Sequence, residues 1–289
     1  MRWKRGCQIG QGTFGKVFKG VNEQTGECFA VKQIPLCSES VDEAAALQSE
    51  IDTMRGLDHP HIVRYIHTDR GERHLYILME FVSNGSVHSW LRQYGVLDDA
   101  LVRRFMHQIL LGVAYLHENR IIHRDIKGAN VLITDQGIAK LADFGCSKRL
   151  AGLCTASADG SLQAIQGSIP WMAPEVIKQS GHGRSADIWS VGATMIEMAT
   201  ASRPWPEFTN NLAAMFHVVT AAAPPPPPDR LSPTARDFLD RCMQIIPDDR
   251  WKAAQLLQHP YLSGAAEELE AFLACSGSNG GGGGGSGGG

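Results

Sequence analysis

Short runs that alternate apolar and polar residues fill the first third of the chain. Residues 16–21, 29–34 and 75–79 each fit a β-strand, because successive side chains of a strand point to opposite faces. One helix is expected among them. Ser40-Val41-Asp42-Glu43 fits a capping box, which predicts a helix from Ser40 to about Leu57.

A helical spacing replaces this alternation in the rest of the chain. Apolar residues recur every three to four positions in residues 98–118 and 185–200, which predicts two long amphipathic helices. Because the strands are consecutive and the helices follow them, we expect an α+β fold with a small β-rich lobe and a larger helical lobe. A doubly wound sheet would need strands and helices in alternation.

A second, smaller pair of strands is expected in residues 131–142, where an Asp135-Gln136-Gly137 turn joins two apolar runs. Such a hairpin would bring Asp125, Asn130 and Asp143 to one end of a small sheet. Two carboxylates and an amide that converge in this way suit magnesium and a phosphoryl group.

Composition and charge narrow the classes of partner. The chain has 289 residues, of which 43% are hydrophobic and 20% charged, with a net charge of −3. We therefore expect no nucleic-acid partner. No apolar run approaches the roughly 18 to 20 residues of a membrane span, so we expect no membrane partner either. The cysteines are odd in number and scattered, which favours reduced thiols and a cytoplasmic or nuclear location.

Two low-complexity stretches occur late in the chain. The prolines from Pro224 to Pro228 fit either an SH3-type ligand or an extended surface connection between two helices. Residues 276–289 are Ser, Asn and Gly only, so we expect a disordered tail.

The segment from Gly10 to Gly15 fits G-x-G-x-x-G, a pattern shared by several kinds of nucleotide site. A dinucleotide-binding unit needs a helix directly after the third glycine, whereas residues 16–21 predict a strand. The segment also fits G-x-x-x-x-G-K, but a P-loop next needs Ser or Thr, and Val17 supplies no oxygen. The remaining interpretation is a strand-loop-strand flap whose backbone amides approach nucleotide phosphates.

Lys32 lies within an apolar strand, where an unpaired ammonium group is costly. It therefore needs a carboxylate or phosphate partner, unless the strand lies at the sheet edge and leaves the amine in solvent. Glu50 in the predicted helix is the candidate carboxylate, with Glu43 and Asp52 as alternatives.

Taken in order, these motifs resemble those of the eukaryotic protein kinases. The matching segments are Gly10 to Val17, Ala30-Val31-Lys32, Glu50, His123 to Asn130, Asp143-Phe144-Gly145, Ala173-Pro174-Glu175, Asp187 to Gly192 and Arg250. The resemblance implies a bilobal kinase domain over residues 3–262, with an N-lobe over about 3–82 and a C-lobe over about 83–262. A short extension over 263–275 and the glycine-rich tail would follow.

The resemblance also implies ATP and Mg²⁺ as cofactors and assigns roles. Asp125 would accept or orient the proton of the acceptor hydroxyl, with Lys127 as its catalytic neighbour. Asn130 and Asp143 would hold metal, and Lys32 would steady the phosphates. The other implied nucleotide-binding residues are Ile9, Gly10, Gln11, Gly12, Thr13, Phe14, Gly15, Lys16, Val17, Ala30, Glu50, the gatekeeper Met79, the hinge residues Glu80 and Val82, and Leu132.

The acceptor class and a narrower resemblance follow from further residues. Lys127 matches the serine/threonine kinases, since tyrosine kinases usually have Ala there. Segments such as Met79-Glu80-Phe81-Val82 and Asp187-Ile188-Trp189-Ser190 resemble MAP kinase kinase kinases of the MEK kinase type, particularly the plant ones. The implied substrate is a MAP kinase kinase, phosphorylated on Ser or Thr of its activation loop. An inactive kinase-fold scaffold is the alternative, and it would normally lack one of the catalytic residues.

Regulation and two departures from the pattern complete the expectations. By the resemblance, Arg124 pairs with a phosphorylated activation loop between Asp143 and Glu175, in which Thr155, Ser157 and Ser161 are the candidate sites. The Ser168 hydroxyl would bond the catalytic loop, which runs from His123 to Asn130. Gly167-Ser168-Ile169-Pro170-Trp171 stands where the family usually has Gly-Thr-Pro-Tyr-Trp, which affects substrate preference. Trp251 replaces a usual proline, and we expect only a local packing change there.

Overall fold

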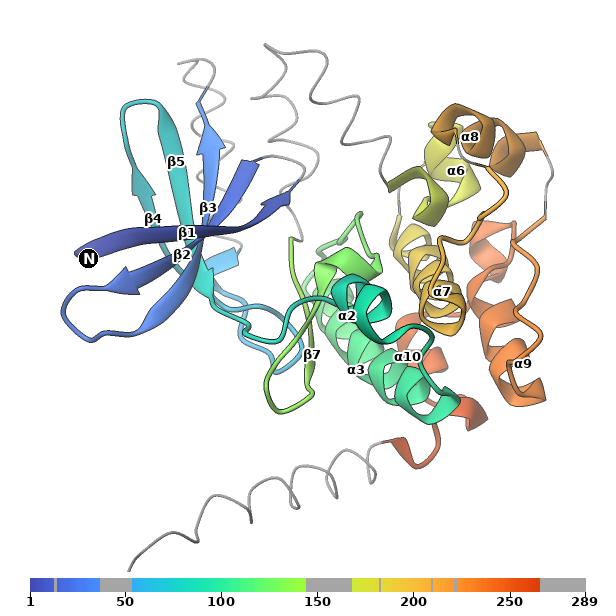
Figure 1. Ribbon diagram of the computed structural model, residues 1–289. Coiled ribbons are helices and arrows are strands. Elements are labelled where there is room, and N and C mark those ends of the chain that lie inside the picture. The colour runs from blue at the N-terminus through green and yellow to red at the C-terminus, as the bar shows by residue number, and fades with distance from the viewer. Residues whose placement is uncertain are drawn as a thin grey trace, which may run out of the picture.

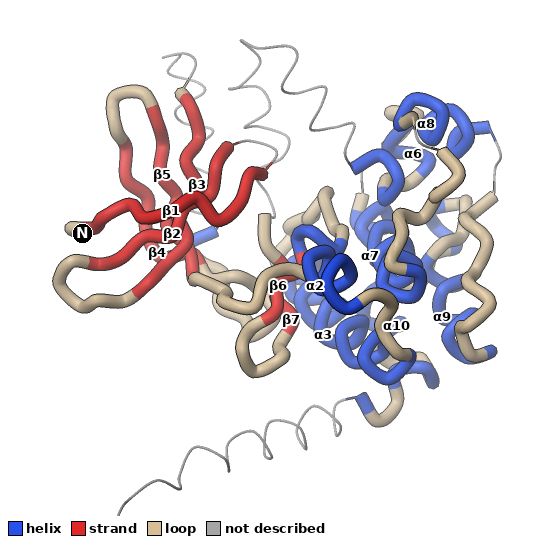
Figure 2. The backbone as a smooth tube through the Cα atoms, viewed as in Figure 1, coloured by secondary structure: helices blue, strands red, loops and turns tan. Residues whose placement is uncertain are grey.

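The computed structural model describes residues 1–12, 15–36, 54–143, 168–181, 183–208, 210–220 and 223–265. The strands gather at one end of the molecule and the helices at the other, with a small two-stranded sheet between them (Figures 1 and 2). The expected α+β arrangement of a β-rich lobe and a helical lobe is confirmed. Within the described residues, no helix has the length and apolar character needed to cross a bilayer.

The N-lobe is an antiparallel sheet in the order β1-β2-β3-β5-β4. Its strands are β1 (Trp3–Gly12), β2 (Gly15–Asn22), β3 (Cys28–Pro35), β4 (Tyr65–Arg70) and β5 (His74–Glu80). The three strands expected from alternation are confirmed as β2, β3 and β5. The helix expected from Ser40 to about Leu57 lies mostly outside the described residues. In the part of it that the structure describes, residues 54–57, Met54 and Arg55 are helical.

The two faces of this sheet bury different residues of β3, because successive side chains of this strand point to opposite faces. Phe29 and Val31 pack with Leu78 on one face, and Trp3 and Phe18 pack against this cluster. The intervening residues of β3 face the other lobe. Both faces of β3 are thus covered, which explains why its side chains form a nearly continuous buried run.

The C-lobe is helical, and its elements follow one another along the chain. They are α2 (Val87–Tyr94), α3 (Asp99–Glu118), η1 (Gly128–Asn130), β6 (Val131–Ile133), β7 (Ala139–Leu141), η2 (Ile169–Trp171), α6 (Pro174–Ile177), α7 (Arg184–Thr200), α8 (Asn211–Thr220), α9 (Pro233–Cys242), η3 (Pro247–Asp249), α10 (Ala253–Leu256) and η4 (Pro260–Leu262). The predicted long helices are confirmed as α3 and α7, and the predicted hairpin as β6–β7.

The core of the C-lobe lies between α3 and α7. Phe105 and Val113 of α3 are fully buried, as is Trp189 of α7. Residues 186–199 of α7 are buried on every side of the helix, so α7 is the central helix of the lobe. Asp98 caps α3 by accepting a hydrogen bond of 2.7 Å from the Leu101 amide, which fixes where that helix begins.

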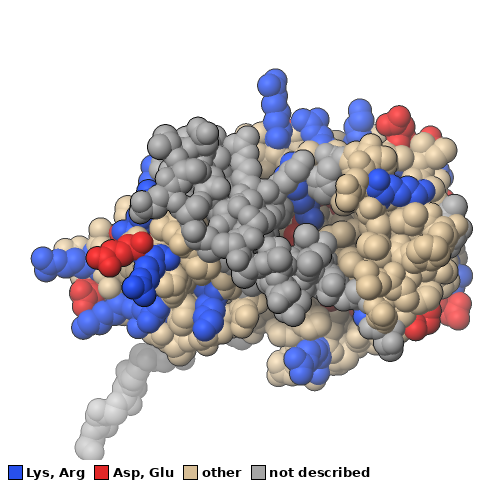
Figure 3. Space-filling view, turned by 90° about the horizontal axis from the view of Figure 1, so that it is seen from above, with Lys and Arg blue, Asp and Glu red and all other residues tan. Residues whose placement is uncertain are grey.

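The surface agrees with the modest net charge. On the face shown in Figure 3, acidic and basic side chains are interspersed at the end formed by the N-lobe.

The prolines from Pro224 to Pro228 form part of the connection between α8 and α9, with Pro225 buried and its neighbours on either side exposed.

Candidate active site

Asp125 lies at the centre of a group of hydrogen bonds within the loop before β6. Lys127 Nζ lies 3.0 and 2.8 Å from the two carboxylate oxygens of Asp125. The turn η1 brings Asn130 back toward the same residue, so that its Nδ2 donates to Asp125 O at 2.7 Å and to Asp125 Oδ2 at 2.8 Å. A carboxylate, an ammonium group and an amide are therefore held together, and the amide oxygen of Asn130 takes no part in these two bonds.

Lys127 also joins this loop to the segment that precedes α6. Its Nζ donates to Ser168 Oγ at 2.7 Å. This contact places Ser168 against the loop of Asp125, as the resemblance implied. The ammonium group of Lys127 thus lies between the carboxylate of Asp125 and a second segment of the chain.

The electrostatics keep Asp125 ionised. Burial would raise its pKa, but the adjacent Lys127 ammonium, helped by the Ser168 hydroxyl, lowers the pKa below its ordinary value. His123 is fully buried, and this burial lowers the pKa of its imidazole. At neutral pH the site therefore contains an anionic Asp125 beside a neutral His123.

Lys32 connects the two lobes at this site. Its Nζ donates to Asp143 Oδ1 at 2.9 Å, and its side chain is only 2% exposed. Because β3 lies between β2 and β5, the edge-strand alternative for Lys32 is wrong. Its candidate carboxylate partner Glu50, together with the alternatives Glu43 and Asp52, lies outside the described residues.

The backbone of the loop is held in an unusual conformation. Arg124 (φ 72°) and Asp143 (φ 62°) are non-glycine residues in the left-handed region, which costs on the order of 1 kcal/mol each. Asp187 of α7 compensates at Arg124. Its carboxylate accepts hydrogen bonds from the amides of His123 at 2.9 Å and Arg124 at 2.8 Å, and His117 Nε2 lies 2.8 Å from the same carboxylate.

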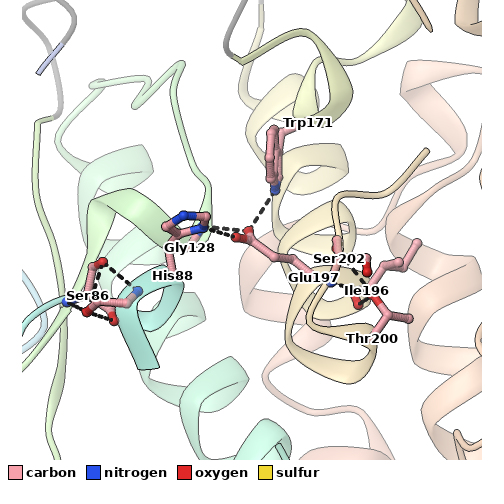
Figure 4. Close-up of polar contacts among 9 residues, drawn as sticks. Ser86, His88, Gly128, Trp171, Ile196, Glu197, Thr200 and Ser202 are labelled. Carbon is pink, nitrogen blue, oxygen red and sulfur yellow. Dashed lines mark hydrogen bonds and ion pairs between the residues drawn. The ribbon is translucent and has the colours of Figure 1, made fainter. Parts of the chain in front are cut away.

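A second buried carboxylate of α7 holds the loop at its other end. Figure 4 shows Glu197 between His88, Gly128 and Trp171. Glu197 Oε2 accepts hydrogen bonds from the Gly128 amide at 2.8 Å and from Trp171 Nε1 at 2.9 Å. Ser190 Oγ donates to the Trp171 carbonyl at 2.8 Å, so the loop and the segment of Trp171 are both fixed to α7.

Arg250 holds the start of α6 through a bidentate ion pair. Its Nη1 and Nη2 lie 2.6 and 2.8 Å from the two Glu175 carboxylate oxygens, and Nη1 also donates to the Ser185 carbonyl at 3.0 Å. The next residue, Trp251, lies under the Arg241 guanidinium, 5.2 Å from the ring centroid. The departure at Trp251 thus coincides with a cation–π contact to Arg241.

The glycine-rich segment is a strand-loop-strand hairpin. Gly12 of β1 pairs with Gly15 of β2, Gly10 pairs with Val17, and β2 continues to Asn22 as a strand. The absence of a helix after Gly15, in a part of the chain that the structure describes, excludes both the dinucleotide-binding unit and the P-loop.

The face of the N-lobe sheet that looks toward Asp143 is built by register. Val17 lies opposite Lys32, and Ala30 lies opposite Met79, so these four side chains share one face. The remaining implied nucleotide-binding residues are spread over the hairpin and the connection between the lobes: Ile9, Gln11 and Lys16 are exposed, and Gly10, Glu80, Val82 and Leu132 are half-buried.

A small pocket lies between Met79, Lys32 and Asp143. It has a volume of about 20 Å³, which suits a water molecule better than an aromatic ring. It is lined by Lys32, Met54, Val63, Tyr65, Ile77, Met79 and Asp143.

The family described as the protein kinase domain matches residues 3–262. The chain belongs to the protein kinase family. Mitogen-activated protein kinase kinase kinase 2 of Arabidopsis thaliana is 45% identical over 289 residues, which is 96% of this chain and 44% of that protein.

Further relatives of the kinase carry similar names. The Arabidopsis thaliana mitogen-activated protein kinase kinase kinase ANP1 is 45% identical over 92% of this chain and 40% of its own length. Mitogen-activated protein kinase kinase kinase A of Dictyostelium discoideum is 41% identical over 93% of this chain and 29% of its own length. The chain therefore spans less than half the length of these relatives.

The donors in the kinase site fit a magnesium ion. Asp143 offers a carboxylate and Asn130 an amide oxygen, and Mg²⁺ prefers such oxygen ligands. The two residues are brought together by the bond of 2.9 Å between the Ala142 amide and the Asn130 carbonyl. Asp143 is also the residue that Lys32 reaches, so a phosphate held by the lysine would lie next to the same metal.

Two charged residues near the kinase site were not predicted from the sequence. Lys140 of β7 lies 2.9 Å from Glu80 Oε1, and the Arg64 amide donates to Glu80 Oε2 at 3.1 Å, so the Glu80 side chain is turned toward β7. Glu197 was the other omission. Its only sequence signal is an isolated acidic residue in the apolar run from Met195 to Met198.

Several predicted residues of the kinase lie outside the described part of the chain. They are Thr13, Phe14, Glu50, Thr155, Ser157 and Ser161, with Phe144 and Gly145 of the Asp-Phe-Gly motif. The residues that the structure does bring together are Asp125, Lys127, Asn130, Ser168, Asp143 and Lys32.

Proposed function

We propose that this protein is a serine/threonine protein kinase that uses ATP and Mg²⁺ and acts as a MAP kinase kinase kinase, phosphorylating a MAP kinase kinase. The observation that carries the proposal is the joining of Asp125, Lys127 and Ser168 by hydrogen bonds of 2.7 to 3.0 Å. The names of its relatives support the substrate class.

Asp125 would orient the acceptor hydroxyl and take up its proton. Its lowered pKa keeps the carboxylate ionised and able to accept a hydrogen bond. Lys127, which is hydrogen-bonded to Asp125, would place its positive charge near the oxygens of the phosphoryl group while that group is transferred to the acceptor. Positioning and electrostatic stabilisation of this kind account for most of the catalysis in phosphoryl transfer.

Lys32 would bind the phosphates of the nucleotide. Its ammonium group is buried and lies against Asp143, so an anionic phosphate would find a desolvated cation there. Asn130 and Asp143 would hold Mg²⁺, which neutralises phosphate charge when bound. Val17, Ala30 and Met79 provide the apolar face on which the base would rest.

The assay for this proposal is transfer of labelled γ-phosphate from ATP to a purified MAP kinase kinase. We expect wild-type protein to label the substrate, and Lys32→Met and Asp125→Asn to reduce the rate by at least about 100-fold. Equal labelling by wild type and both variants would refute the active-kinase proposal. No labelling by a folded wild-type protein, on this substrate or on generic acceptor proteins, would favour the inactive scaffold.

A further inference from the structure

Glu197 is a buried carboxylate whose partners on one oxygen are both neutral. Glu197 as a whole is 3% exposed, and its Oε2 accepts hydrogen bonds from the Gly128 amide and the Trp171 indole. Neutral donors compensate part of the cost of burying a charge, but a carboxylate in this position is stabilised further by a positive group.

The other oxygen of Glu197 faces His88 of α2. His88 Nδ1 lies 3.4 Å from Glu197 Oε1, and Figure 4 shows the imidazole directed at the carboxylate. The side chain of His88 is 53% exposed, whereas that of Glu197 is 4% exposed. Among the described residues that contact Glu197, His88 is the group that can carry a positive charge.

Protonation of His88 is therefore linked to the charge of Glu197. The hydrogen bond to Glu197 raises the pKa of His88, and this effect outweighs partial burial, which lowers the pKa. The negative charge of Glu197 raises the pKa further, whereas the positive charge of Arg92 on the same helix lowers it. Gly128 and Trp171, which pack against the same carboxylate from the catalytic loop and η2, add no charge. Since the pKa is raised on folding, the favourable interaction is fully present below about pH 6.5 and is lost as the pH rises through the folded-state value.

We propose that His88 is a positioning residue of the kinase: as an imidazolium it balances the charge of Glu197, and Glu197 in turn holds the catalytic loop at Gly128 and the neighbouring segment at Trp171. His88 thereby ties α2 to both segments that flank Asp125 and Ser168. The inference rests on the proposed phosphotransfer activity, because its readout is the rate of that reaction.

The first test compares wild type with His88→Asn between pH 6 and pH 9. The Asn amide replaces Nδ1–H as a donor but carries no charge. We expect wild type to have an about two- to fivefold higher kcat/KM for the protein acceptor at pH 6, as suits a half-exposed ion pair, and the ratio to approach one at pH 9. The KM for ATP should stay unchanged, since Lys32 and Asp143 make no contact with this pair among the described residues.

The matched control is His74→Asn, in the N-lobe hairpin between β4 and β5. It makes the same chemical change away from Glu197 and should give a ratio of one at every pH. An active wild type whose ratio to His88→Asn is flat over this range would overturn the proposal. A wild type without any activity would instead count against the proposed function.

The second test asks whether His88 acts through Glu197. Glu197→Gln keeps the hydrogen-bond acceptor but removes the charge, so His88→Asn should have no further pH-dependent effect in that background. An undiminished effect of His88→Asn in a folded Glu197→Gln protein would show that His88 acts on something else, and the proposal would fail. If Glu197→Gln does not fold, the pH-dependent ratio of the single variant decides the matter alone.

Discussion

Gly128 is the point at which a single added methyl group tests how the catalytic loop is held. A Cβ atom at this position would lie 2.6 Å from Glu197 Oε1 and 2.8 Å from Glu197 Cδ, well inside van der Waals contact. The φ of Gly128 lies outside the left-handed region, so Gly128→Ala tests this close approach without backbone strain.

The cost follows from what Glu197 must give up. The carboxylate can rotate away from the new methyl group, but rotation breaks the bonds of 2.8 and 2.9 Å that it accepts from Gly128 and Trp171. Hydrogen bonds to a charged group contribute about 1.5–3 kcal/mol each, and some of this returns when new partners form. We expect Gly128→Ala to lower the free energy of unfolding by about 2–4 kcal/mol.

This loss is large enough to measure by two methods. For a domain of this size it corresponds to a Tm lower by roughly 5 to 15 °C in calorimetry. Because misplacement of a catalytic group by about 1 Å can cost about 100-fold, we also expect kcat to fall by about 10- to 100-fold.

The matched control is Gly181→Ala, where a Cβ atom would meet nothing within 4 Å. Its free energy of unfolding should stay within about 0.5 kcal/mol of wild type. The reasoning would be refuted if Gly128→Ala kept its Tm within about 2 °C and its kcat within about twofold of the control.

The remaining predictions concern Arg250 and the activation segment. Arg250→Lys keeps the charge but loses the bidentate bond to Glu175, so it should lower the free energy of unfolding by about 2–3 kcal/mol; an unchanged urea midpoint would contradict this. The active kinase should carry phosphate on at least one of Thr155, Ser157 and Ser161, because Arg124 Nε is buried and meets no hydrogen-bond partner within the described part of the chain. Peptide mass spectrometry of the active protein tests this, and full activity with all three residues unmodified would count against it.

Local patterns predicted the elements of the fold well. The alternation in β3 and the helical spacing in α3 and α7 fall within one residue of the observed bounds, because each element buries a face that its own sequence defines. The β6–β7 hairpin followed from turn chemistry and from two short apolar runs.

Contacts between distant residues were harder to predict. The proximity of Asp125, Asn130 and Asp143 could be anticipated because one hairpin joins them. The bond of Glu197 to Gly128 spans 69 positions and depends on how α7 packs against the loop, which no local pattern encodes. The pairing of Glu80 with Lys140 likewise depends on tertiary packing, since each residue alone fits a solvated position on a strand.

The identity of the residue phosphorylated in the substrate decides whether this protein acts as the proposed serine/threonine kinase. A MAP kinase kinase should be incubated with ATP and either wild type or Asp125→Asn, and its phosphorylated positions mapped by mass spectrometry. The account predicts phosphate on serine or threonine of the activation loop with wild type, and its loss with Asp125→Asn. Phosphate on tyrosine, or the same phosphorylated positions with both proteins, would contradict it.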